Sequence, residues 1–451
     1  MKKTISLFAY FLLSISLLYS QARGKSSSTA LVDGHPAWIM QGNIYEVNVR
    51  QYTREGTFKA FAKHLDRLKK MGVQTVWFMP INPISKVDRK GSLGSYYAVS
   101  DYTALNPEFG NLTEWKALVN SIHHMGMKVI IDWVPNHTGG DNRWLKEHPD
   151  FFVKDSTGKA AIAKDWADTR QLDYANRVMQ DSMIAAMKYW VRISNIDGFR
   201  CDVAWNVPGS FWNRCIGELK KMKTLFFLAE GDSSYLPKSG FDAVYPWRMF
   251  HMMVKVASGE RPALGLDSIQ REDDTLYPKN TIQMYFTSNH DENSWNKADF
   301  GTFPGAAHAP FAVFTQTMSK GVPLIYSGQE EPVLRAIEFF EKDPIEFVKF
   351  KRSSFYQKLL YLRRDNPALA ANASFKKLNT AEDNSIYAFV REKSGNKILV
   401  VLNLSSKEQK FSIPYKTLTG TALNLFKGKK EPLPKSWKME PWGYAVYVYG
   451  N

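Results

Sequence analysis

The sequence predicts an α/β protein: a closed parallel (β/α)8 barrel with a small excursion domain after its third strand and a C-terminal antiparallel β-sandwich. Between residues 44 and 364, short apolar runs alternate with amphipathic segments, as strands followed by helices do. Residues 135–175 interrupt this alternation without a clear period, and from about residue 371 short alternating segments replace the helical pattern. Eight strand–helix units over this length fit a closed barrel, with a doubly wound open sheet as the structural alternative.

The spacing of apolar residues places each element. Short apolar runs predict strands at residues 44–49, 73–79, 127–134, 196–203, 225–230, 241–245, 281–286 and 323–326. Apolar residues three or four positions apart predict helices at residues 58–71, 112–125, 176–193, 208–222, 249–258, 307–320 and 355–364. In the last part of the chain, period-2 segments predict strands at residues 385–391, 397–404, 409–413, 422–426 and 444–449.

These elements divide the chain into parts. A chain of 451 residues is long for a single core, so several folded parts are expected. We expect the barrel to comprise residues 36–134 and 176–368, the excursion domain residues 135–175, and the β-sandwich residues 371–451.

The N-terminus predicts export. Residues 1–22 have the features of a signal peptide: Lys2 and Lys3 precede an apolar stretch over residues 5–19, and Ser20-Gln21-Ala22 forms a small-x-small cleavage site. The apolar stretch is too short for a comfortable membrane span, and no other segment is apolar enough to cross a bilayer. We therefore expect a mature chain without membrane insertion, located in a periplasm or outside the cell.

Charge and cysteine content exclude some functional classes. The formal net charge is +15, but the Lys and Arg residues are scattered, with no basic stripe interleaved with aromatic residues. We therefore expect no nucleic-acid partner. Two cysteines, Cys201 and Cys215, cannot form a disulfide framework. An aromatic content of 14%, including 13 Trp and 21 Tyr, suits stacking on sugar faces or other flat ligands.

The strand at residues 196–203 combines an apolar face with a charged one. With period 2, Phe199 and Cys201 face one side, and Arg200 and Asp202 face the other. A guanidinium within hydrogen-bonding reach favours an ionised carboxylate, so we expect Asp202 to be charged and suited to a nucleophile or an electrostatic catalyst. A structural ion pair between Arg200 and Asp202 is the alternative.

Other strands also end in polar residues. Such residues project from the C-terminal face of a barrel, where its active sites lie. Acids follow three of these strands, at Asp202, Glu230 and Asp291. Glu230 comes after the apolar run 225–229, and such surroundings together with nearby negative charge favour a protonated carboxyl suited to general acid catalysis. Three acids at one face predict a catalytic cleft.

Several motifs, in one order along the chain, carry a family resemblance. The principal ones are Asp132-Trp-Val-Pro-Asn-His137, Gly198-Phe-Arg-Cys-Asp202, Leu228-Ala-Glu230 and Thr287-Ser-Asn-His-Asp291, with support from residues 72–80, 97–102 and 106–110. Together they span nearly all of residues 40–330, and the chain resembles the α-amylase family of glycoside hydrolases. This resemblance implies a TIM barrel, an excursion domain after strand three and a C-terminal sandwich.

The resemblance also implies catalytic roles. Asp202 corresponds to the nucleophile that forms a covalent glycosyl-enzyme. Glu230 corresponds to the acid that protonates the departing oxygen and then to the base that activates water. Asp291 corresponds to the residue that holds the sugar hydroxyls and favours the distorted, oxocarbenium-like state. These are the roles that a retaining glycosidase requires of its carboxyl groups.

Further positions match residues that contact the substrate in the family. His137 and His290 would hydrogen-bond the sugar beside the cleaved bond, and Tyr97 would stack on its ring. Arg200 would orient Asp202, and Asp132 would belong to the network beneath them.

Two departures from the family pattern bear on specificity and on metal binding. Many members carry a Lys-His pair where this chain has Trp205 and Asn206. Trp205 either offers a stacking surface on the leaving-group side or is a packing residue. The calcium site of the family often uses the Asn that aligns with Asn136, but Gln171 stands where an acid is common. A structural calcium ion at Asn136 is thus one option, and no cofactor is required for the chemistry.

The resulting hypothesis is an exported enzyme that cleaves α-1,4-glucosidic bonds in starch-like or maltodextrin substrates with retention. An α-glucosidase, a cyclodextrin hydrolase and a transglycosylase of the same family are alternatives. A non-catalytic glucan-binding protein is a further alternative, although a binding remnant has no need of Asp202, Glu230 and Asp291 together.

Overall fold

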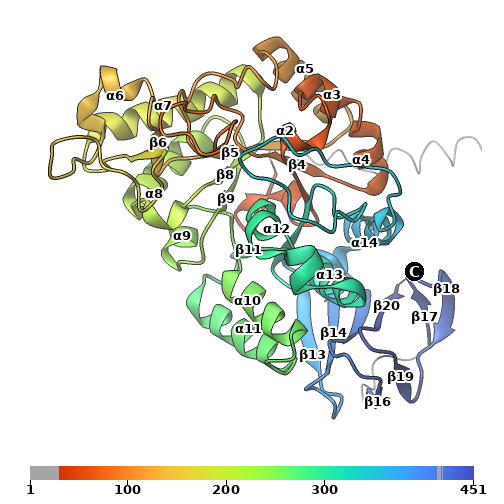
Figure 1. Ribbon diagram of the computed structural model, residues 1–451. Coiled ribbons are helices and arrows are strands. Elements are labelled where there is room, and N and C mark those ends of the chain that lie inside the picture. Colours follow the sequence, from red (N-terminus) through yellow and green to blue (C-terminus); the bar gives the residue numbers. More distant parts are fainter. Residues whose placement is uncertain (1–29, 414–417, 419, 451) are drawn as a thin grey trace, which may run out of the picture.

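The computed structural model describes residues 30–413, 418 and 420–450 (Figure 1). The predicted signal peptide, residues 1–22, lies outside the described residues. Within the described ranges, no helix is both long enough and apolar enough to cross a membrane.

Eight parallel strands form a closed barrel. They are β3 (Ile44–Val47), β4 (Thr75–Phe78), β5 (Lys128–Trp133), β8 (Gly198–Cys201), β9 (Phe226–Ala229), β10 (Ala243–Val244), β11 (Ile282–Tyr285) and β12 (Gly321–Tyr326). Because β12 pairs in parallel with β3, the sheet has no edge. The predicted (β/α)8 barrel is confirmed, and the doubly wound open sheet is wrong.

Helices surround the barrel. The longer ones are α4 (Leu65–Met71), α5 (Leu112–His124), α7 (Arg177–Ser194), α8 (Gly209–Lys220), α10 (Trp247–Ala257), α11 (Gly265–Leu276), α12 (His290–Asn296), α13 (His308–Thr317) and α14 (Ser353–Asp365). The shorter ones are α2 (Val49–Tyr52), α3 (Phe58–Ala62), α6 (Trp144–Glu147) and α9 (Tyr235–Lys238). Single-turn helices lie at Ala37–Ile39, Pro149–Phe151, Ala204–Asn206, Gly305–Ala307 and Pro367–Leu369, with a π-helix at Ala298–Thr302.

Local sequence explains several helix boundaries. At the start of α5, the Asn111 side chain accepts from the Glu114 N–H, and the Glu114 carboxylate accepts from the Asn111 N–H, a capping box. The helix predicted at residues 58–71 is instead two helices, α3 and α4, separated by Lys63 and His64. Apolar periodicity runs through this break, so spacing alone could not reveal it.

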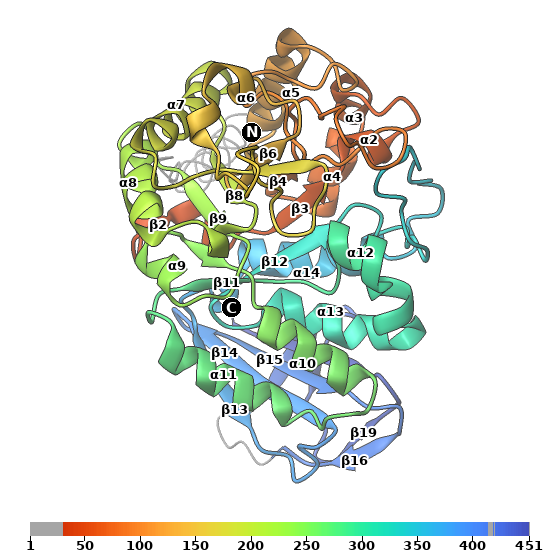
Figure 2. The same ribbon diagram turned by 60° about the vertical axis from the view of Figure 1, so that its left-hand side comes forward.

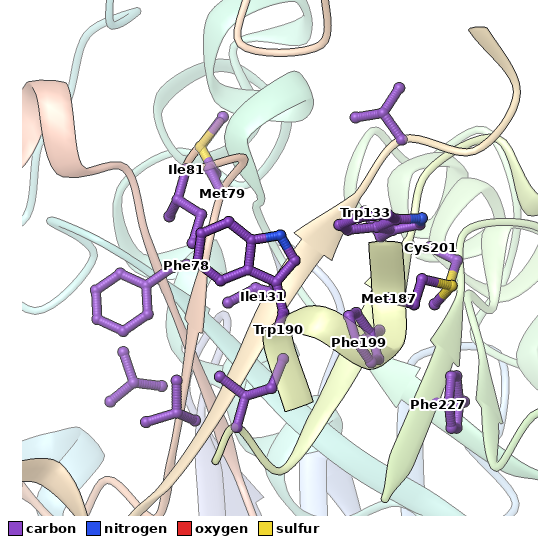
Figure 3. Close-up of a cluster of buried hydrophobic side chains, with 14 of the residues drawn as sticks. Phe78, Met79, Ile81, Ile131, Trp133, Met187, Trp190, Phe199, Cys201 and Phe227 are labelled. Atoms are coloured by element: carbon purple, nitrogen blue, oxygen red, sulfur yellow. The ribbon is translucent and has the colours of Figure 1, made fainter. Parts of the chain in front are cut away.

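The outer face of the barrel packs against α7. In Figure 3, Met187 and Trp190 of α7 lie against strand residues that include Ile131 and Phe199. Phe199 and Cys201 are fully buried on this outer face, as period 2 predicted. A Cβ at Gly198 would lie only 2.0 Å from the carbonyl oxygen of Phe226, so β8 approaches β9 too closely for any other residue.

The excursion domain leaves the barrel between β5 and α7. Its two short strands, β6 (His137–Gly139) and β7 (Thr169–Gln171), pair antiparallel, and α6 lies between them in sequence. In Figure 1, α6 and β6 lie on the same side of the barrel as β5 and β8. At the N-terminal side, β1 (Leu31–Val32) and β2 (His35–Pro36) form a small hairpin.

Antiparallel strands form the C-terminal part. They are β13 (Ser374–Leu378), β14 (Ile386–Lys393), β15 (Asn396–Asn403), β16 (Gln409–Phe411), β17 (Thr421–Asn424), β18 (Lys429–Pro432), β19 (Trp437–Met439) and β20 (Tyr444–Tyr449). Six form one sheet, in the order β13-β14-β15-β20-β17-β18, and β16 pairs with β19. The predicted antiparallel architecture is confirmed, although β13, β18 and β19 were not predicted. The domain boundaries given above remain predictions.

One apolar cluster joins the C-terminal sheet to the barrel. Tyr387, Phe389 and Val400 belong to the same buried cluster as Phe311 and Phe314 of α13. Figure 2 shows β14 and β15 beneath the helices α10, α11 and α13. Arg391 of β14 adds hydrogen bonds from its guanidinium to the carbonyl oxygens of Thr317 and Ala370, at 2.7 and 2.8 Å.

A buried acid, Asp197, lies at the opposite, N-terminal face of the barrel. Asp197 precedes β8 and accepts a hydrogen bond from the N–H of Val129 at 3.0 Å. It also lies 2.7 Å from His123, 3.2 Å from Lys128 and 3.0 Å from Lys223. Burial raises the pKa of Asp197, but the hydrogen bond from His123 and the two lysine charges outweigh burial and hold this pKa below its ordinary value.

Replacing Asp197 by Asn should lower the free energy of unfolding by about 3 kcal/mol at neutral pH, because Lys128 and Lys223 lose their anion and His123 loses a charged partner. Since the folded-state pKa is depressed, this stabilisation is present above the unfolded pKa and is lost as the pH falls below about 4. Urea unfolding at a series of pH values measures the effect. Asp165→Asn, at an exposed position, is the control; equal stability of both variants at pH 7 would contradict the role of Asp197.

Candidate active site

Arg200 lies inside the barrel and contacts three acids from three strand ends. Its Nη1 donates to Asp132 Oδ1 at 2.9 Å and to Asp202 Oδ1 at 2.7 Å. Its Nη2 forms an ion-pair contact with Glu230 Oε2 at 3.2 Å. Asp202 and Glu230 thus lie against neighbouring nitrogens of one planar group.

Aromatic rings enclose this guanidinium. The Arg200 Cζ lies 5.3 Å from the ring centre of Trp77, 5.7 Å from that of Tyr97 and 5.6 Å from that of Tyr245. Arg200 is fully buried, and cation–π contacts of this kind partly replace its lost hydration. Burial opposes the charge, but Asp132, Tyr245 and Glu230 outweigh it, so the pKa of Arg200 is raised well above its ordinary value.

Val203, the residue after Asp202, has a strained backbone. Its φ is 46° and its ψ is 37°, a left-handed conformation that a β-branched residue adopts at a cost of about 1–3 kcal/mol. In this conformation its N–H donates to Glu230 Oε2 at 2.6 Å. The strain therefore coincides with the contact that joins the end of β8 to the end of β9.

A second cluster centres on His290 at the start of α12. Its Nδ1 lies 2.5 Å from Glu46 Oε1, and its Nε2 lies 2.8 Å from Tyr97 Oη and 3.3 Å from Asp291 Oδ2. Burial opposes protonation, but Asp291 and Glu46 outweigh it and raise the pKa of His290 well above its ordinary value. Burial likewise opposes the ionisation of Asp291, but the charge and hydrogen bond of His290 lower the pKa of Asp291.

The two clusters share one pocket. Its volume is about 400 Å³, within the range of small-molecule sites. Its lining comes from the strand ends, the excursion domain and two loops: Lys90, Ser95, Tyr97, His137, Trp166, Asp168, Thr169, Asp202, Val203, Glu230, His290, Asp291, Trp295, Phe339 and Phe340. Six residues proposed from the sequence, namely Tyr97, His137, Asp202, Glu230, His290 and Asp291, are therefore brought together.

His137 enters the pocket from the excursion domain. Its ring centre lies 5.2 Å from that of Trp166. Burial lowers the pKa of His137 to about 4, so this imidazole is neutral at physiological pH. A neutral imidazole can both donate to and accept from a hydroxyl group.

The pKa of Asp202 is shifted in the opposite direction from the expectation based on Arg200 alone. Burial raises the pKa of Asp202 well above its ordinary value, the charge of Glu230 adds to the rise, and Arg200 opposes it. Burial also raises the pKa of Asp132 to about 6, against the opposing charges of Arg200 and His290. The physical reason is that Asp132 and Asp202 are buried and share one guanidinium with Glu230, so Arg200 cannot compensate all three carboxyl groups.

Trp205 lies beside the pocket, outside its lining. Its side chain is half-exposed, and Lys164 Nζ lies 4.3 Å from the ring centre. Gly231, the residue after Glu230, has φ 139° and would place a Cβ 3.0 Å from the Trp205 side chain. Trp205 therefore packs against the residue that follows Glu230 and contacts Lys164 of the excursion domain.

Asn136 belongs to a network of amides. Gln171 Nε2 donates to the backbone oxygen of Asn136 at 2.9 Å, to Asn136 Oδ1 at 3.2 Å and to the backbone oxygen of Leu172 at 3.2 Å. Asn206 Nδ2 donates to the same Asn136 Oδ1 at 2.8 Å. Among the described residues, no group of three or more His, Cys, Asp or Glu side chains could hold a metal ion.

These residues do not fit the calcium site that the resemblance suggested at Asn136. Calcium takes six to eight oxygen ligands, including carboxylates. Here an amide NH₂ group faces the converging carbonyl oxygens, and both acceptor positions of Asn136 Oδ1 are used by nitrogen donors.

Part of the pocket was not predicted. Lys90 and Asp168, 3.5 Å apart, line it together with Trp295, Phe339 and Phe340. Phe339 and Phe340 lie in residues 327–352, a long loop without the periodicity of a helix or strand. The adjacent pair of aromatic residues was the available signal, but aromatic pairs are also common in cores.

Comparisons with known proteins agree with this fold. The family model for the α-amylase catalytic domain matches residues 23–170, and that for the maltogenic amylase C-terminal domain matches residues 375–446. The crystal structure of an α-amylase from Lactobacillus plantarum has a TM-score of 0.82 and 28% identity to this chain, and covers 92% of this chain and 100% of that one. The chain belongs to the α-amylase family.

Curated relatives extend the comparison. The α-amylase MalA of Haloarcula japonica is 25% identical over 402 residues, which cover 84% of this chain and 58% of its own length. A cyclomaltodextrinase of Thermoanaerobacter pseudethanolicus is 27% identical over 432 residues, which cover 88% of this chain and 70% of that relative. This α-amylase family enzyme therefore spans 58% of the length of the first relative and 70% of the length of the second.

Asp202→Asn and Asp291→Asn should change stability in opposite directions at neutral pH. Because the pKa of Asp202 is raised in the folded state, its ionisation destabilises the fold above the unfolded pKa of about 4. Asn at this position should therefore raise the free energy of unfolding by about 1–3 kcal/mol at pH 7 and leave it unchanged below pH 4. The lowered pKa of Asp291 means that its charge stabilises the folded state, so Asn there should lower stability. Urea unfolding at pH 4 and pH 7 measures both; effects of the same sign at pH 7 would contradict this assignment.

Chelation should leave the thermal unfolding midpoint unchanged, because the amide network leaves no calcium site at Asn136. Gln171→Leu should lower the free energy of unfolding by about 1–3 kcal/mol, because buried carbonyl oxygens lose their donor. Scanning calorimetry with and without EDTA measures both effects, and Asn120→Leu, at an exposed position, is the control. A midpoint that falls in EDTA and recovers with added Ca²⁺ would show that the amide network is misassigned.

Proposed function

We propose that this enzyme is a retaining glycoside hydrolase that cleaves α-1,4-glucosidic bonds in starch-like or maltodextrin substrates through a covalent glycosyl-enzyme. The contact of Asp202 and Glu230 with one guanidinium, at 2.7 and 3.2 Å, is the observation that carries the proposal. Retaining enzymes hold their two carboxyl groups about 5–5.5 Å apart, whereas inverting enzymes need about 6.5–9.5 Å to admit a water molecule. Neighbouring nitrogens of one guanidinium favour the shorter spacing.

The reaction has two displacement steps. In the first, an Asp202 oxygen bonds to the anomeric carbon, the glycosidic bond breaks, and Glu230 transfers a proton to the departing oxygen. In the second, Glu230 takes a proton from water, whose oxygen bonds to the anomeric carbon as the bond to Asp202 breaks. Two inversions leave the anomeric configuration unchanged.

The first step requires an ionised Asp202. Burial and the charge of Glu230 raise the pKa of Asp202, and the charge of Arg200 opposes this rise. The role of general acid requires a protonated Glu230, and a neutral Glu230 would no longer oppose the ionisation of Asp202. The acid and the nucleophile are therefore compatible in this arrangement.

The other pocket residues hold the sugar. Asp291, kept ionised by His290, accepts hydrogen bonds from sugar hydroxyls, and His290 donates to them. Tyr97 presents its ring to the sugar, and neutral His137 contacts a further hydroxyl. Arg200 and Asp132 keep Asp202 in position, and Trp205 offers a surface on the leaving-group side. No cofactor is needed for this chemistry.

The substrate class follows the family. Relatives are named α-amylase and cyclomaltodextrinase, so an α-glucan is the substrate we propose. An α-glucosidase, a cyclodextrin hydrolase and a transglycosylase remain alternatives within the family. Export to a periplasm or the medium, guided by residues 1–22, is part of the proposal, as is the absence of nucleic-acid partners.

Asp202→Asn and Glu230→Gln should each lower kcat on an α-maltoside with a poor leaving group by about a thousandfold or more, because each removes a group that acts in the transition state. Circular dichroism checks folding, and Glu338→Gln, at an exposed position, is the control. With an activated aryl maltoside, azide should restore turnover in the Glu230→Gln variant alone and yield a glycosyl azide with the anomeric configuration of the substrate. Near-normal turnover of either variant, or an azide product of inverted configuration, would overturn the assignment.

A further inference from the structure

We propose that the pocket is closed beyond the sugar whose anomeric carbon Asp202 attacks, on the side away from the cleaved bond, so that the enzyme binds the non-reducing end of an α-glucan and releases short products from it. This inference rests on the proposed function and adds the mode of attack. Its basis is a set of contacts that join two loops, residues 79–111 after β4 and residues 327–352 after β12. We call the joined residues Lys90, Ser92, Leu93, Phe339, Phe340 and Glu341 the end wall.

Hydrogen bonds connect the two loops across the end of the pocket. The N–H of Leu93 donates to the carbonyl oxygen of Phe340 at 3.1 Å. The N–H of Ser92 donates to Glu341 Oε1 at 2.7 Å, and the Ser92 hydroxyl donates to Glu341 Oε2. Gly91 has φ 63°, and a Cβ there would lie 2.6 Å from Phe340 Cβ. The two loops are therefore in van der Waals contact, without a gap for a polysaccharide chain.

Buried polar side chains hold the end wall in place. Gln51, which is fully buried, donates to the carbonyl oxygens of Glu338 and Glu341 at 2.8 and 2.7 Å. Arg50, also buried, donates to the carbonyl oxygens of Leu93 and Gly94, each at 3.1 Å. Because these donors replace water for the loop carbonyls, opening the wall would leave buried polar groups without partners.

The end wall lies beside the residues proposed to contact the sugar whose anomeric carbon is attacked. The ring centre of Phe339 lies 6.3 Å from that of Tyr97 and 6.5 Å from that of His290, the residues proposed to contact this sugar. Glu230, which must face the departing oxygen, accepts a hydrogen bond from the N–H of Val203, and the next residue, Gly231, lies against Trp205. A bound glucan therefore extends from the cleaved bond toward Trp205 and ends at the wall.

The excursion domain extends the closure. Asp168 lies 3.5 Å from Lys90, and Arg170 lies 2.8 Å from Asp88 of the same loop after β4. Lys90 and Asp168 both line the pocket and offer a donor and an acceptor to the hydroxyl groups of a terminal sugar. The pocket volume of about 400 Å³ lies at the lower end of the range for small-molecule sites.

The test uses two aryl maltoheptaosides, one with a free non-reducing end and one whose terminal 4- and 6-hydroxyl groups carry an ethylidene bridge. We expect kcat/KM to be about 100-fold lower for the blocked substrate, because the bridge cannot enter a closed pocket. Equal cleavage of both substrates would overturn the inference while leaving the proposed function intact. Failure to cleave either substrate would instead overturn the proposed function, and the inference with it.

Variants of the wall test its cause. Glu341→Ala removes the carboxylate that joins the loops and should raise kcat/KM on the blocked substrate about tenfold relative to the free one. The double variant Ser92→Ala/Glu341→Ala should do the same, and circular dichroism establishes folding. Glu338→Ala, an exposed acid on the same loop, should keep the discrimination of the wild type. Unchanged discrimination in both folded wall variants would overturn the assignment to these residues.

Discussion

The interior of the barrel depends on the charge of one buried guanidinium. Arg200 is fully enclosed, and a buried cation is tolerated only when anions and hydrogen bonds replace its hydration. Asp132, Asp202 and Glu230 supply this compensation from the ends of β5, β8 and β9. Each strand must therefore keep its register, because a shift by one residue would turn its acid toward the surrounding helices.

The same arrangement creates an imbalance on which the chemistry draws. The three carboxyl groups can carry more negative charge than Arg200 can balance. Burial therefore raises the pKa of Asp132 and of Asp202 despite the opposing charge of Arg200. The neighbouring cluster has the opposite balance, since His290 lies between Glu46 and Asp291 and its charge lowers the pKa of Asp291. The pKa values of Asp202 and Asp291, two acids of one pocket, are thus shifted in opposite directions, because the balance of neighbouring charge differs around them.

Much of the fold could be predicted because its signals are local. All eight barrel strands were predicted from apolar runs, and the outward orientation of Phe199 and the inward orientation of Arg200 followed from period 2. The break between α3 and α4 and the helix α11 were missed, since apolar spacing does not change at the first and the second is largely polar. The strand β18 was missed because it is rich in lysine and has no apolar alternation.

The site was predictable to the extent that its residues stand at strand ends. Asp202, Glu230 and Asp291 could be grouped because a barrel brings the carboxyl ends of its strands to one face. The proton preference of Asp202 could not be predicted, because it depends on how many acids share Arg200. Phe340 and Glu341 could not be placed either, since their partners lie about 250 residues away in the sequence. Contacts between loops that lie far apart in the sequence produce no periodic pattern of apolar residues.

The apolar cluster that joins the C-terminal sheet to α13 has a consequence for how the molecule can be divided. Tyr387, Phe389 and Val400 complete a core whose other half belongs to the barrel helix, and Arg391 satisfies carbonyl groups at the same junction. Neither half can present a polar surface to water if the other is removed. We therefore expect the two parts to unfold together, and recombination between relatives would have to exchange both sides of this interface at once.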